Sequence, residues 1–281
     1  MKDKLFIWFQ YLVPQHFISR IIGFFADHHW PWLTDAIIAW FARRYQVAMA
    51  DAENTDLKSY RTFNEFFTRP LKADSRPMPA DGATWVSPVD GKISQYGDIS
   101  QGQIVQAKGR TYSVEELLGG DTDLAEKFSS GKFMTIYLSP KDYHRIHMPV
   151  DGKLENMVFV PGKLFSVNQV TAENVPRLFA RNERVVAVFD TPMGKMAMVL
   201  VGAMVVASIE TVWAGVVAPL TRKVMRNNYP GAEINLHQGQ EMGRFRLGST
   251  VILLTDNHAV EWAEQSLGHN GDIRLGDILI H

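Results

Sequence analysis

The chain has 281 residues, a formal net charge of −1 and no cysteine. This length allows one large domain with an appendage, and the near-zero charge gives no reason to expect a nucleic-acid partner. The lack of cysteine excludes disulfides, thiolate metal sites and a cysteine nucleophile. No uncharged apolar run approaches the roughly 18–20 residues needed to span a bilayer, and a signal peptide fits the first residues poorly.

Aromatic side chains crowd the first 45 residues, where basic residues outnumber acidic ones. The pattern predicts three short helices, the second after Pro14 and the third with Thr34 as its N-cap. Their expected ranges are about 3–12, 14–27 and 34–45. Apolar residues recur at helical spacing in the second helix: Phe17, Ile18, Ile21, Ile22 and Phe25. Such helices suit the interfacial layer of a membrane, and the alternative is packing on the rest of the protein or in a dimer interface.

A short helix is predicted next, with Thr62 and Glu65 forming a capping box. Its Phe residues at 63, 66 and 67 are expected to pack in a core. We expect Arg69 and Arg76 at the surface or in salt bridges.

From Trp85 onward the sequence has short apolar runs broken by Gly, Asp and Pro, which is typical of β structure. The run Pro-Val-Asp-Gly-Lys-Ile at 88–93 recurs as Pro-Val-Asp-Gly-Lys-Leu at 149–154. Asp-Gly between strands is typical of hairpins, so the echo indicates a duplicated β-motif of the barrel-sandwich kind. No linker-like stretch follows residue 60. We therefore predict an α+β fold, with N-terminal amphipathic helices followed by a mostly β, duplicated barrel-sandwich-like domain.

Two histidines follow a predicted buried strand at 133–138. If the chain is extended there, His144 and His147 point to opposite faces and can do separate jobs. A metal site is an alternative, but no third ligand stands at a recognisable distance and the HExxH pattern is absent. A second alternative is that both are ordinary loop or core histidines. Farther on, 196–213 is predicted to form two strands bent at Gly202.

The stretch Leu247-Gly248-Ser249-Thr250 leads into a strand-like run at 251–254. The Ser249 hydroxyl can attack the Gly248 carbonyl, since glycine adds no side chain to block the approach. The resulting ester would undergo β-elimination and cut the chain, and hydrolysis of the new N-terminus would leave a pyruvoyl ketone. That ketone can act as an electron sink for an amine substrate. The plainer interpretation is a turn that enters a strand.

Three stretches decide between these interpretations: Gly-Gln-Glu-Met-Gly-Arg-Phe-Arg-Leu-Gly-Ser-Thr at 239–250, Phe-Asn-Glu-Phe-Phe at 63–67 and Leu-Phe-Ala-Arg-Asn-Glu-Arg-Val at 178–185. Together they resemble phosphatidylserine decarboxylase proenzymes of the bacterial membrane-bound type, over nearly the whole chain. The resemblance implies self-cleavage between Gly248 and Ser249 into a β chain (1–248) and an α chain (249–281). It also implies decarboxylation of phosphatidylserine to phosphatidylethanolamine.

The resemblance also assigns the site residues. It maps His147 onto the base for Ser249, Asp90 onto the carboxylate that holds this base, and His144 onto a group used in decarboxylation. The residues alone do not distinguish Asp90 from Asp151, because both stand in the same local sequence. The implied cofactor is the covalent pyruvoyl group from Ser249, with neither pyridoxal phosphate nor a metal.

Residues 1–58 are expected to form a membrane-associating region and 59–281 the catalytic domain. The implied location is the cytoplasmic side of the cell membrane, peripherally bound, as a homodimer of α/β pairs. Arg145 is a candidate for contact with a substrate carboxylate or phosphate, and Thr250 for an oxyanion donor. The aromatic residues expected to line the pocket are Tyr143, Phe165 and Phe245.

Two other functions fit parts of the sequence. A pyruvoyl decarboxylase for a soluble amino acid would not need the aromatic N-terminal helices. A barrel-sandwich carrier or phosphotransfer module with a phosphoryl-accepting histidine would explain the Asp-Gly echo but not the Gly-Ser site. Such carriers usually hold a Met-Lys-Met turn, whereas Lys195 stands between Gly194 and Met196.

Overall fold

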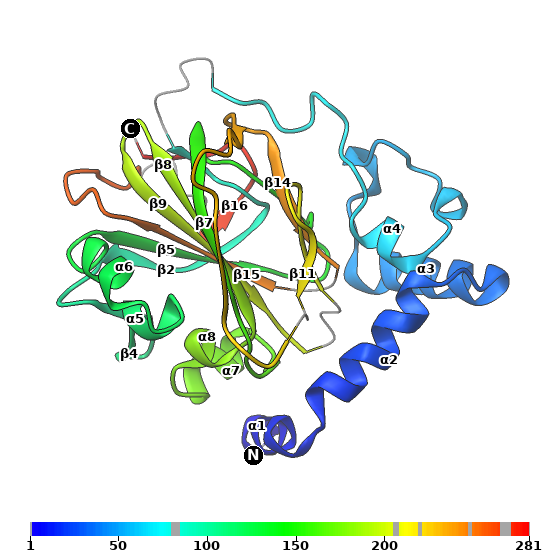
Figure 1. Ribbon diagram of the computed structural model, residues 1–281. Coiled ribbons are helices and arrows are strands. Elements are labelled where there is room, and N and C mark those ends of the chain that lie inside the picture. Colours follow the sequence, from blue (N-terminus) through cyan, green and yellow to red (C-terminus); the bar gives the residue numbers. More distant parts are fainter. Residues whose placement is uncertain are drawn as a thin grey trace.

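The computed structural model describes residues 2–79, 85–204, 208–218, 221–246, 249–264 and 271–280. It begins with α1 (Lys2–Leu12), α2 (Gln15–Asp27) and α3 (Pro31–Tyr45), then two 3₁₀ turns (Met49–Asp51 and Leu57–Ser59) and α4 (Phe63–Phe67). These helices lie to one side of the β-rich remainder (Figure 1). The three predicted N-terminal helices are confirmed, with bounds that differ by at most three residues.

The start of α3 differs from the prediction. Pro31 occupies the first helical turn and Trp30 is the N-cap, so Thr34 lies inside the helix. The Thr34 hydroxyl accepts a hydrogen bond from the Trp30 backbone N–H at 3.1 Å. Proline favours this position because it has no N–H to leave unpaired and its φ is already helical.

The predicted cap of α4 is present. The Thr62 hydroxyl accepts from the Glu65 N–H at 3.1 Å, and the Glu65 carboxylate accepts from the Arg61 N–H at 2.7 Å. The aromatic residues of α4 pack against α2 and α3 in one small core. The buried members of this core are Ala26, Ile38, Phe41, Val47, Tyr60, Phe66 and Phe67.

Antiparallel strands form the rest of the molecule. The central sheet has the order β12 (Met225–Asn228), β7 (Gly152–Val160), β8 (Arg184–Thr191), β9 (Gly194–Gly202), β15 (Ser249–Thr255), β5 (Lys132–Leu138), β2 (Gly91–Asp98) and β16 (Asp272–Ile273), with β13 (Asn235–Leu236) beside β7. A second sheet has the order β11 (Gly215–Ala218), β10 (Ile209–Thr211), β14 (Glu241–Phe245) and β6 (Arg145–His147). Two small pairs join β1 (Trp85–Val86) to β17 (Ile278–Ile280) and β3 (Gln103–Ala107) to β4 (Arg110–Ser113).

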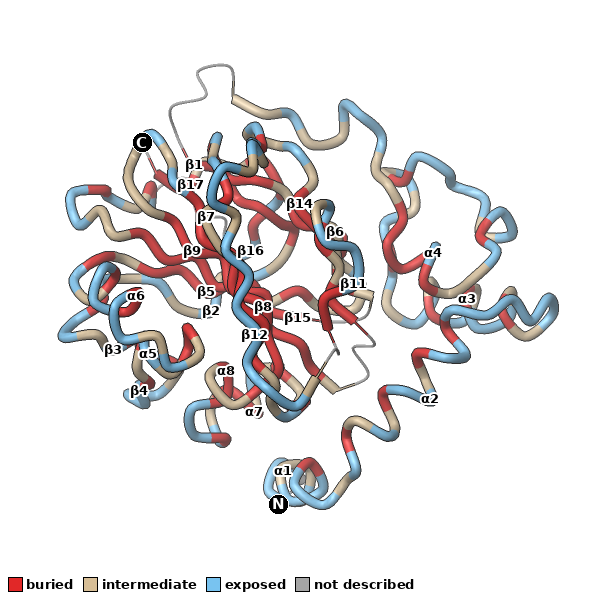
Figure 2. The backbone as a smooth tube through the Cα atoms, viewed as in Figure 1, coloured by how far each residue is buried: buried red, intermediate tan, exposed pale blue. Residues whose placement is uncertain are grey.

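Both faces of the central sheet are covered, which explains the continuous apolar runs of its strands. On one face, Val251 and Leu253 share a core with Ile146, Ile209 and other residues of the second sheet. On the other face, Ile252 and Leu254 share a core with four short helices: α5 (Val114–Leu117), α6 (Thr122–Lys127), α7 (Gln169–Asn174) and α8 (Leu178–Arg181). Figure 2 shows the resulting buried interior of these strands.

The α+β prediction, with helices first and a mostly β remainder, is confirmed. The two sheets lie face to face as a sandwich, and the central sheet is open because its order ends at β12 and β16. Each Asp-Gly echo leads into a long strand, β2 or β7. However, the strands that precede the echoes pair elsewhere, β1 with β17 and β6 with β14, so neither echo closes a hairpin.

Candidate active site

Ser249 is the first residue of β15, in the middle of the central sheet. It lies opposite Leu138 of β5 on one side and Gly202 of β9 on the other. Its side chain is fully buried, and the hydroxyl has no hydrogen-bond partner within the described ranges. A buried hydroxyl without a partner is energetically unfavourable, and such groups in native structures often mark chemistry.

Leu247 and Gly248 lie outside the described residues, but both flanks of the predicted scissile bond are described. On the N-terminal flank, the Phe245 N–H donates to the His144 carbonyl at 3.0 Å. On the other flank, Ser249 pairs with Leu138, and Ser139 follows directly. The Ser139 hydroxyl is likewise buried, beside the Asp142 carboxylate, which accepts from the Ser139 N–H at 2.6 Å.

His144 is fully buried in the segment before β6. Its ring stacks on Phe67 at 4.0 Å between centroids, and its Nε2–H donates to the Ser139 carbonyl at 3.1 Å. Nδ1 therefore carries the free lone pair, and it has no partner among the described residues. Burial, with the nearby Arg69 guanidinium, lowers the pKa of His144 to about 3. The ring is thus neutral at physiological pH, with Nδ1 as the atom that can accept a hydrogen bond or a proton.

His147 ends β6 in a different environment. Its Nδ1–H donates to the Gly239 carbonyl at 2.7 Å, and its Nε2 accepts from the Tyr143 hydroxyl at 3.1 Å. Burial lowers its pKa below the ordinary value. The ring is therefore oriented as a neutral base with Nε2 as the basic atom. The extended backbone of β6 separates the two histidines, which fits the expectation of separate environments.

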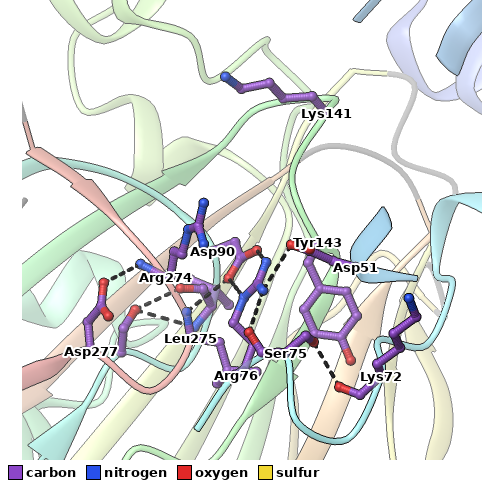
Figure 3. A network of polar contacts seen from close by, with 12 residues as sticks. Asp51, Lys72, Ser75, Arg76, Asp90, Lys141, Tyr143, Arg274, Leu275 and Asp277 are labelled. Atoms are coloured by element: carbon purple, nitrogen blue, oxygen red, sulfur yellow. Dashed lines mark hydrogen bonds and ion pairs between the residues drawn. The ribbon is translucent and has the colours of Figure 1, made fainter. Parts of the chain in front are cut away.

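Asp90 lies just before β2 and belongs to an ion-pair network (Figure 3). Its carboxylate accepts from Arg76 Nε at 2.9 Å and from Arg76 Nη2 at 2.5 Å, and from the Leu275 N–H at 2.9 Å. Arg76 also binds Asp51 at 3.1 Å. The expected salt-bridging role of Arg76 is confirmed.

Asp90 and His147 occupy neighbouring segments, since the His147 N–H donates to the Pro88 carbonyl at 2.9 Å. Asp90 also acts electrostatically to raise the His147 pKa, against the larger effect of burial. Within the described ranges, however, no hydrogen bond or ion pair joins Asp90, His147 and Ser249 to one another. The structure thus brings the three segments together without closing a hydrogen-bonded triad.

Asp151, the echo of Asp90, is exposed. It accepts from the Gln238 N–H at 2.7 Å and lies 3.3 Å from His237. The same local sequence therefore gives one aspartate near the candidate site and one at the surface.

A cavity of about 660 Å³ adjoins Asp90 and the end of β5. Its wall includes Arg76, Asp90, Ser139 and Tyr143. Tyr143 was expected to line a pocket and does so here. Phe165 lines a second cavity, described below, and Phe245 is buried in the core between the two sheets.

The remaining candidates are engaged in other contacts. The Arg145 guanidinium binds Glu241 at 2.8 Å and donates to the Thr68 carbonyl at 2.8 Å. Arg69 is buried, with its guanidinium over the Phe66 ring. The Thr250 hydroxyl is buried without a partner among the described residues.

Sequence reasoning missed Glu183, which lies just before β8. Its residue is 6% exposed, and burial raises its pKa to about 7. The only sequence signal was one acidic residue inside the matched run at 178–185, which looks like a solvated charged turn.

Over the described ranges, no group of three or more His, Asp and Glu side chains is arranged to hold a metal ion. Nor is any described helix both long enough and apolar enough to cross a bilayer.

Comparisons with known proteins agree with the resemblance. A family model for phosphatidylserine decarboxylase matches residues 63–281, and a second, described as PSD, matches residues 5–46. A phosphatidylserine decarboxylase proenzyme of Pseudomonas aeruginosa (strain LESB58) is 56% identical over 281 residues, which is 99% of this chain and 97% of that protein. Proteins of the same name from Pseudomonas putida (strain GB-1) and Hahella chejuensis are 55% and 54% identical, over 99% of this chain and 98% and 93% of their own lengths. This chain therefore belongs to the phosphatidylserine decarboxylase family.

Proposed function

We propose that this chain is a proenzyme that cleaves itself between Gly248 and Ser249 and then decarboxylates phosphatidylserine to phosphatidylethanolamine in phospholipid biosynthesis. The observation that carries the proposal is the buried, unpartnered Ser249 hydroxyl at the start of a central strand, in a chain of this family. The products would be a β chain of residues 1–248 and an α chain of residues 249–281.

The residues around Ser249 fit a covalent pyruvoyl group at this position. Gly202, opposite Ser249, has no side chain to crowd it, and the Ser249 hydroxyl is buried without a partner in the described part of the chain. When formed, the pyruvoyl ketone would supply the electron sink that a separate cofactor supplies in other decarboxylases.

His147 is proposed as the base that takes the proton from the Ser249 hydroxyl. Its lowered pKa keeps the ring neutral, and the bond from Nδ1–H to the Gly239 carbonyl leaves Nε2 as the basic atom. Asp90 is proposed to stabilise the imidazolium that forms, because a nearby carboxylate favours the charged ring. For this role the Asp90 carboxylate would exchange part of its pairing with Arg76 for contact with His147.

His144 is proposed to serve the decarboxylation step. Its buried, neutral ring presents a free Nδ1 near the flank of the cleavage site. A carboxylate bound beside it would raise its pKa, because an opposite charge favours the protonated form. The ring could then accept a proton and return it to the substrate carbon.

We propose that residues 1–58 hold the protein at the cytoplasmic face of the cell membrane and that 59–281 form the catalytic domain. In α2 the buried positions are small or polar: Gln15, Ser19, Gly23 and Ala26. Four large apolar side chains instead face outward, namely Phe17, Ile21, Phe24 and Phe25, and Phe17 is 64% exposed. An exposed aromatic face beside basic residues suits the membrane interface. Two α/β pairs are proposed to form a homodimer.

The test is the intact mass of the purified protein beside a Ser249→Ala variant, with turnover measured on phosphatidylserine vesicles and on free serine. We expect cleavage in the wild type only, and carbon dioxide release from phosphatidylserine only. An uncut yet active wild type would contradict the proposal. Turnover of free serine alone would instead favour a decarboxylase for a soluble amino acid.

A further inference from the structure

A second cavity, of about 770 Å³, lies between the N-terminal helices and the end of the central sheet. The corner between α1 and α2 forms one wall. Two buried glutamines anchor this corner: Gln15 Oε1 accepts from the Leu164 N–H at 2.7 Å, and Gln10 Oε1 accepts from the Ser166 N–H at 2.9 Å. The opposite wall includes Lys163, Arg181 and Glu183. The cavity thus joins the proposed membrane-facing helices to the catalytic domain.

The charges of this cavity are mostly positive and largely unpaired. Arg20, Lys163 and Arg222 line it and are exposed, and none of the three takes part in an ion pair within the described ranges. Glu183 is the acidic residue among the described residues that line it, and it is buried. Unpaired cations near a single buried carboxyl suit a ligand that carries both anionic groups and a cationic group.

Glu183 also lies in the same row of the sheet as Ser249. The Gly202 N–H donates to the Glu183 carbonyl at 2.9 Å, and Gly202 is the register partner of Ser249. Two strand spacings separate the Glu183 and Ser249 backbones by about 10 Å. Register partners project to the same face, and the residue between them is a glycine without a side chain. Glu183 and Ser249 therefore point to the same face of the sheet, and Leu164 Cδ2 lies 3.5 Å from the position that a Cβ on Gly202 would take.

We infer that this cavity receives the polar head of phosphatidylserine, with the phosphodiester on Arg20, Lys163 and Arg222 and the serine ammonium on the Glu183 carboxylate. This assignment rests on the function proposed above. The head group carries two anionic groups and one cationic group, which matches the cavity in sign. Glu183 then takes one proton from the ammonium nitrogen onto its carboxylate and leaves a neutral amine. Burial raises the pKa of Glu183, so this pKa lies closer to the pKa of an amine than the pKa of an ordinary glutamate does.

The test measures binding in the Ser249→Ala chain, which cannot form the pyruvoyl group. Calorimetric titration uses dihexanoyl phosphatidylserine and, separately, dihexanoyl phosphatidic acid, which has the phosphate but no amine. Adding Glu183→Gln should weaken phosphatidylserine binding about tenfold or more, because a buried charged hydrogen bond is lost. Phosphatidic acid binding should not weaken. The double change Arg20→Gln and Lys163→Gln should weaken both ligands. Glu233→Gln, at an exposed position, is the matched control.

The assignment is overturned if Glu183→Gln leaves the phosphatidylserine affinity within twofold of the parent, or if it weakens both lipids equally. Thermal unfolding of each variant shows whether a loss reflects misfolding, and Glu183→Asp, which keeps the charge with a shorter reach, should recover part of the affinity. Intact mass separates this inference from the proposed function. If a chain with Ser249 intact never cleaves, the proposed function fails while the binding result stands. If Glu183→Gln alone blocks cleavage in a folded chain, Glu183 serves the cleavage and the head-group assignment is wrong.

Discussion

The two cavities differ in how the charged side chains discussed above are paired. In the cavity beside β5, Asp90 and Asp51 are both satisfied by Arg76. In the cavity beneath the α1–α2 corner, cations line the space without ion pairs in the described part of the chain, although Arg20 acts electrostatically on the buried Glu183. Charges that satisfy one another fix the positions of side chains, whereas unsatisfied charges leave their partners to be supplied by a ligand.

The largest expected effect is on the rate of self-cleavage and concerns His147. His147→Ala should slow self-cleavage about 10²–10⁴-fold, because it removes the proposed base. A time course of intact mass measures this, with His237→Ala, an exposed histidine beside Asp151, as the control. If His144→Ala slows cleavage and His147→Ala does not, the base is His144, whose carbonyl already contacts Phe245.

Asp90→Asn should lower the free energy of unfolding by about 2 kcal/mol, because the half-buried Arg76 loses its closer carboxylate partner and keeps Asp51. Adding Arg76→Gln should recover part of that stability without restoring the cleavage rate. Chemical denaturation and intact mass measure the two effects separately. Asp151→Asn, in the same local sequence but exposed, should change stability by no more than about 0.5 kcal/mol. If Asp90→Asn and Asp151→Asn changed the free energy of unfolding equally, the ion pair of Asp90 with Arg76 would not be what stabilises the protein.

The free energy of unfolding should depend on pH through Glu183. Burial raises the pKa of Glu183 to about 7, so the folded state binds this proton more tightly than the unfolded state. The free energy of unfolding therefore loses a contribution as the pH rises from about 4.5 through 7. Glu183→Gln should be more stable than the wild type at pH 8, by on the order of 2 kcal/mol, and nearly equal to it at pH 4. A stability difference that does not change with pH would show that Glu183 is not desolvated.

The smallest effect concerns the rim of the second cavity, where Phe17 is exposed. Phe17→Ser should weaken binding to vesicles of phosphatidylcholine and phosphatidylglycerol by about fivefold, which corresponds to about 1 kcal/mol of lost burial. Co-sedimentation measures the change. Tyr96→Ser alters an exposed aromatic residue of β2 and should leave vesicle binding unaltered. Equal loss in both variants would argue against a specific membrane face on α2.

Local patterns predicted most of the elements. Helical spacing located α1 to α3, and the Thr62–Glu65 pair located the start of α4, because both signals depend on neighbours within a few residues. The Thr34 prediction failed because Pro31 is the stronger start signal. The hairpin prediction failed because strand partners are chosen by the whole sheet: β1 pairs with β17, almost two hundred residues away.

Only part of the candidate site could be predicted from the sequence. Asp90 and Asp151 have identical neighbours, and what separates them is Arg76 from a distant segment. Glu183 stands between Asn182 and Arg184, which makes it look solvated. Its burial depends on segments distant in sequence, including the α1–α2 corner, and no local pattern encodes such a contact.

The anchoring of that corner has a practical consequence for making a detergent-free version of the protein. Deleting the first 27 residues would remove the acceptors for the Leu164 and Ser166 amides and loosen the loop that leads to Asn182 and Gly202. Truncation would therefore disturb the proposed catalytic domain as well as remove most of the proposed membrane-associating helices. Replacing the exposed aromatic residues with polar ones, while keeping Gln10 and Gln15, should make the protein less apolar and preserve these two hydrogen bonds.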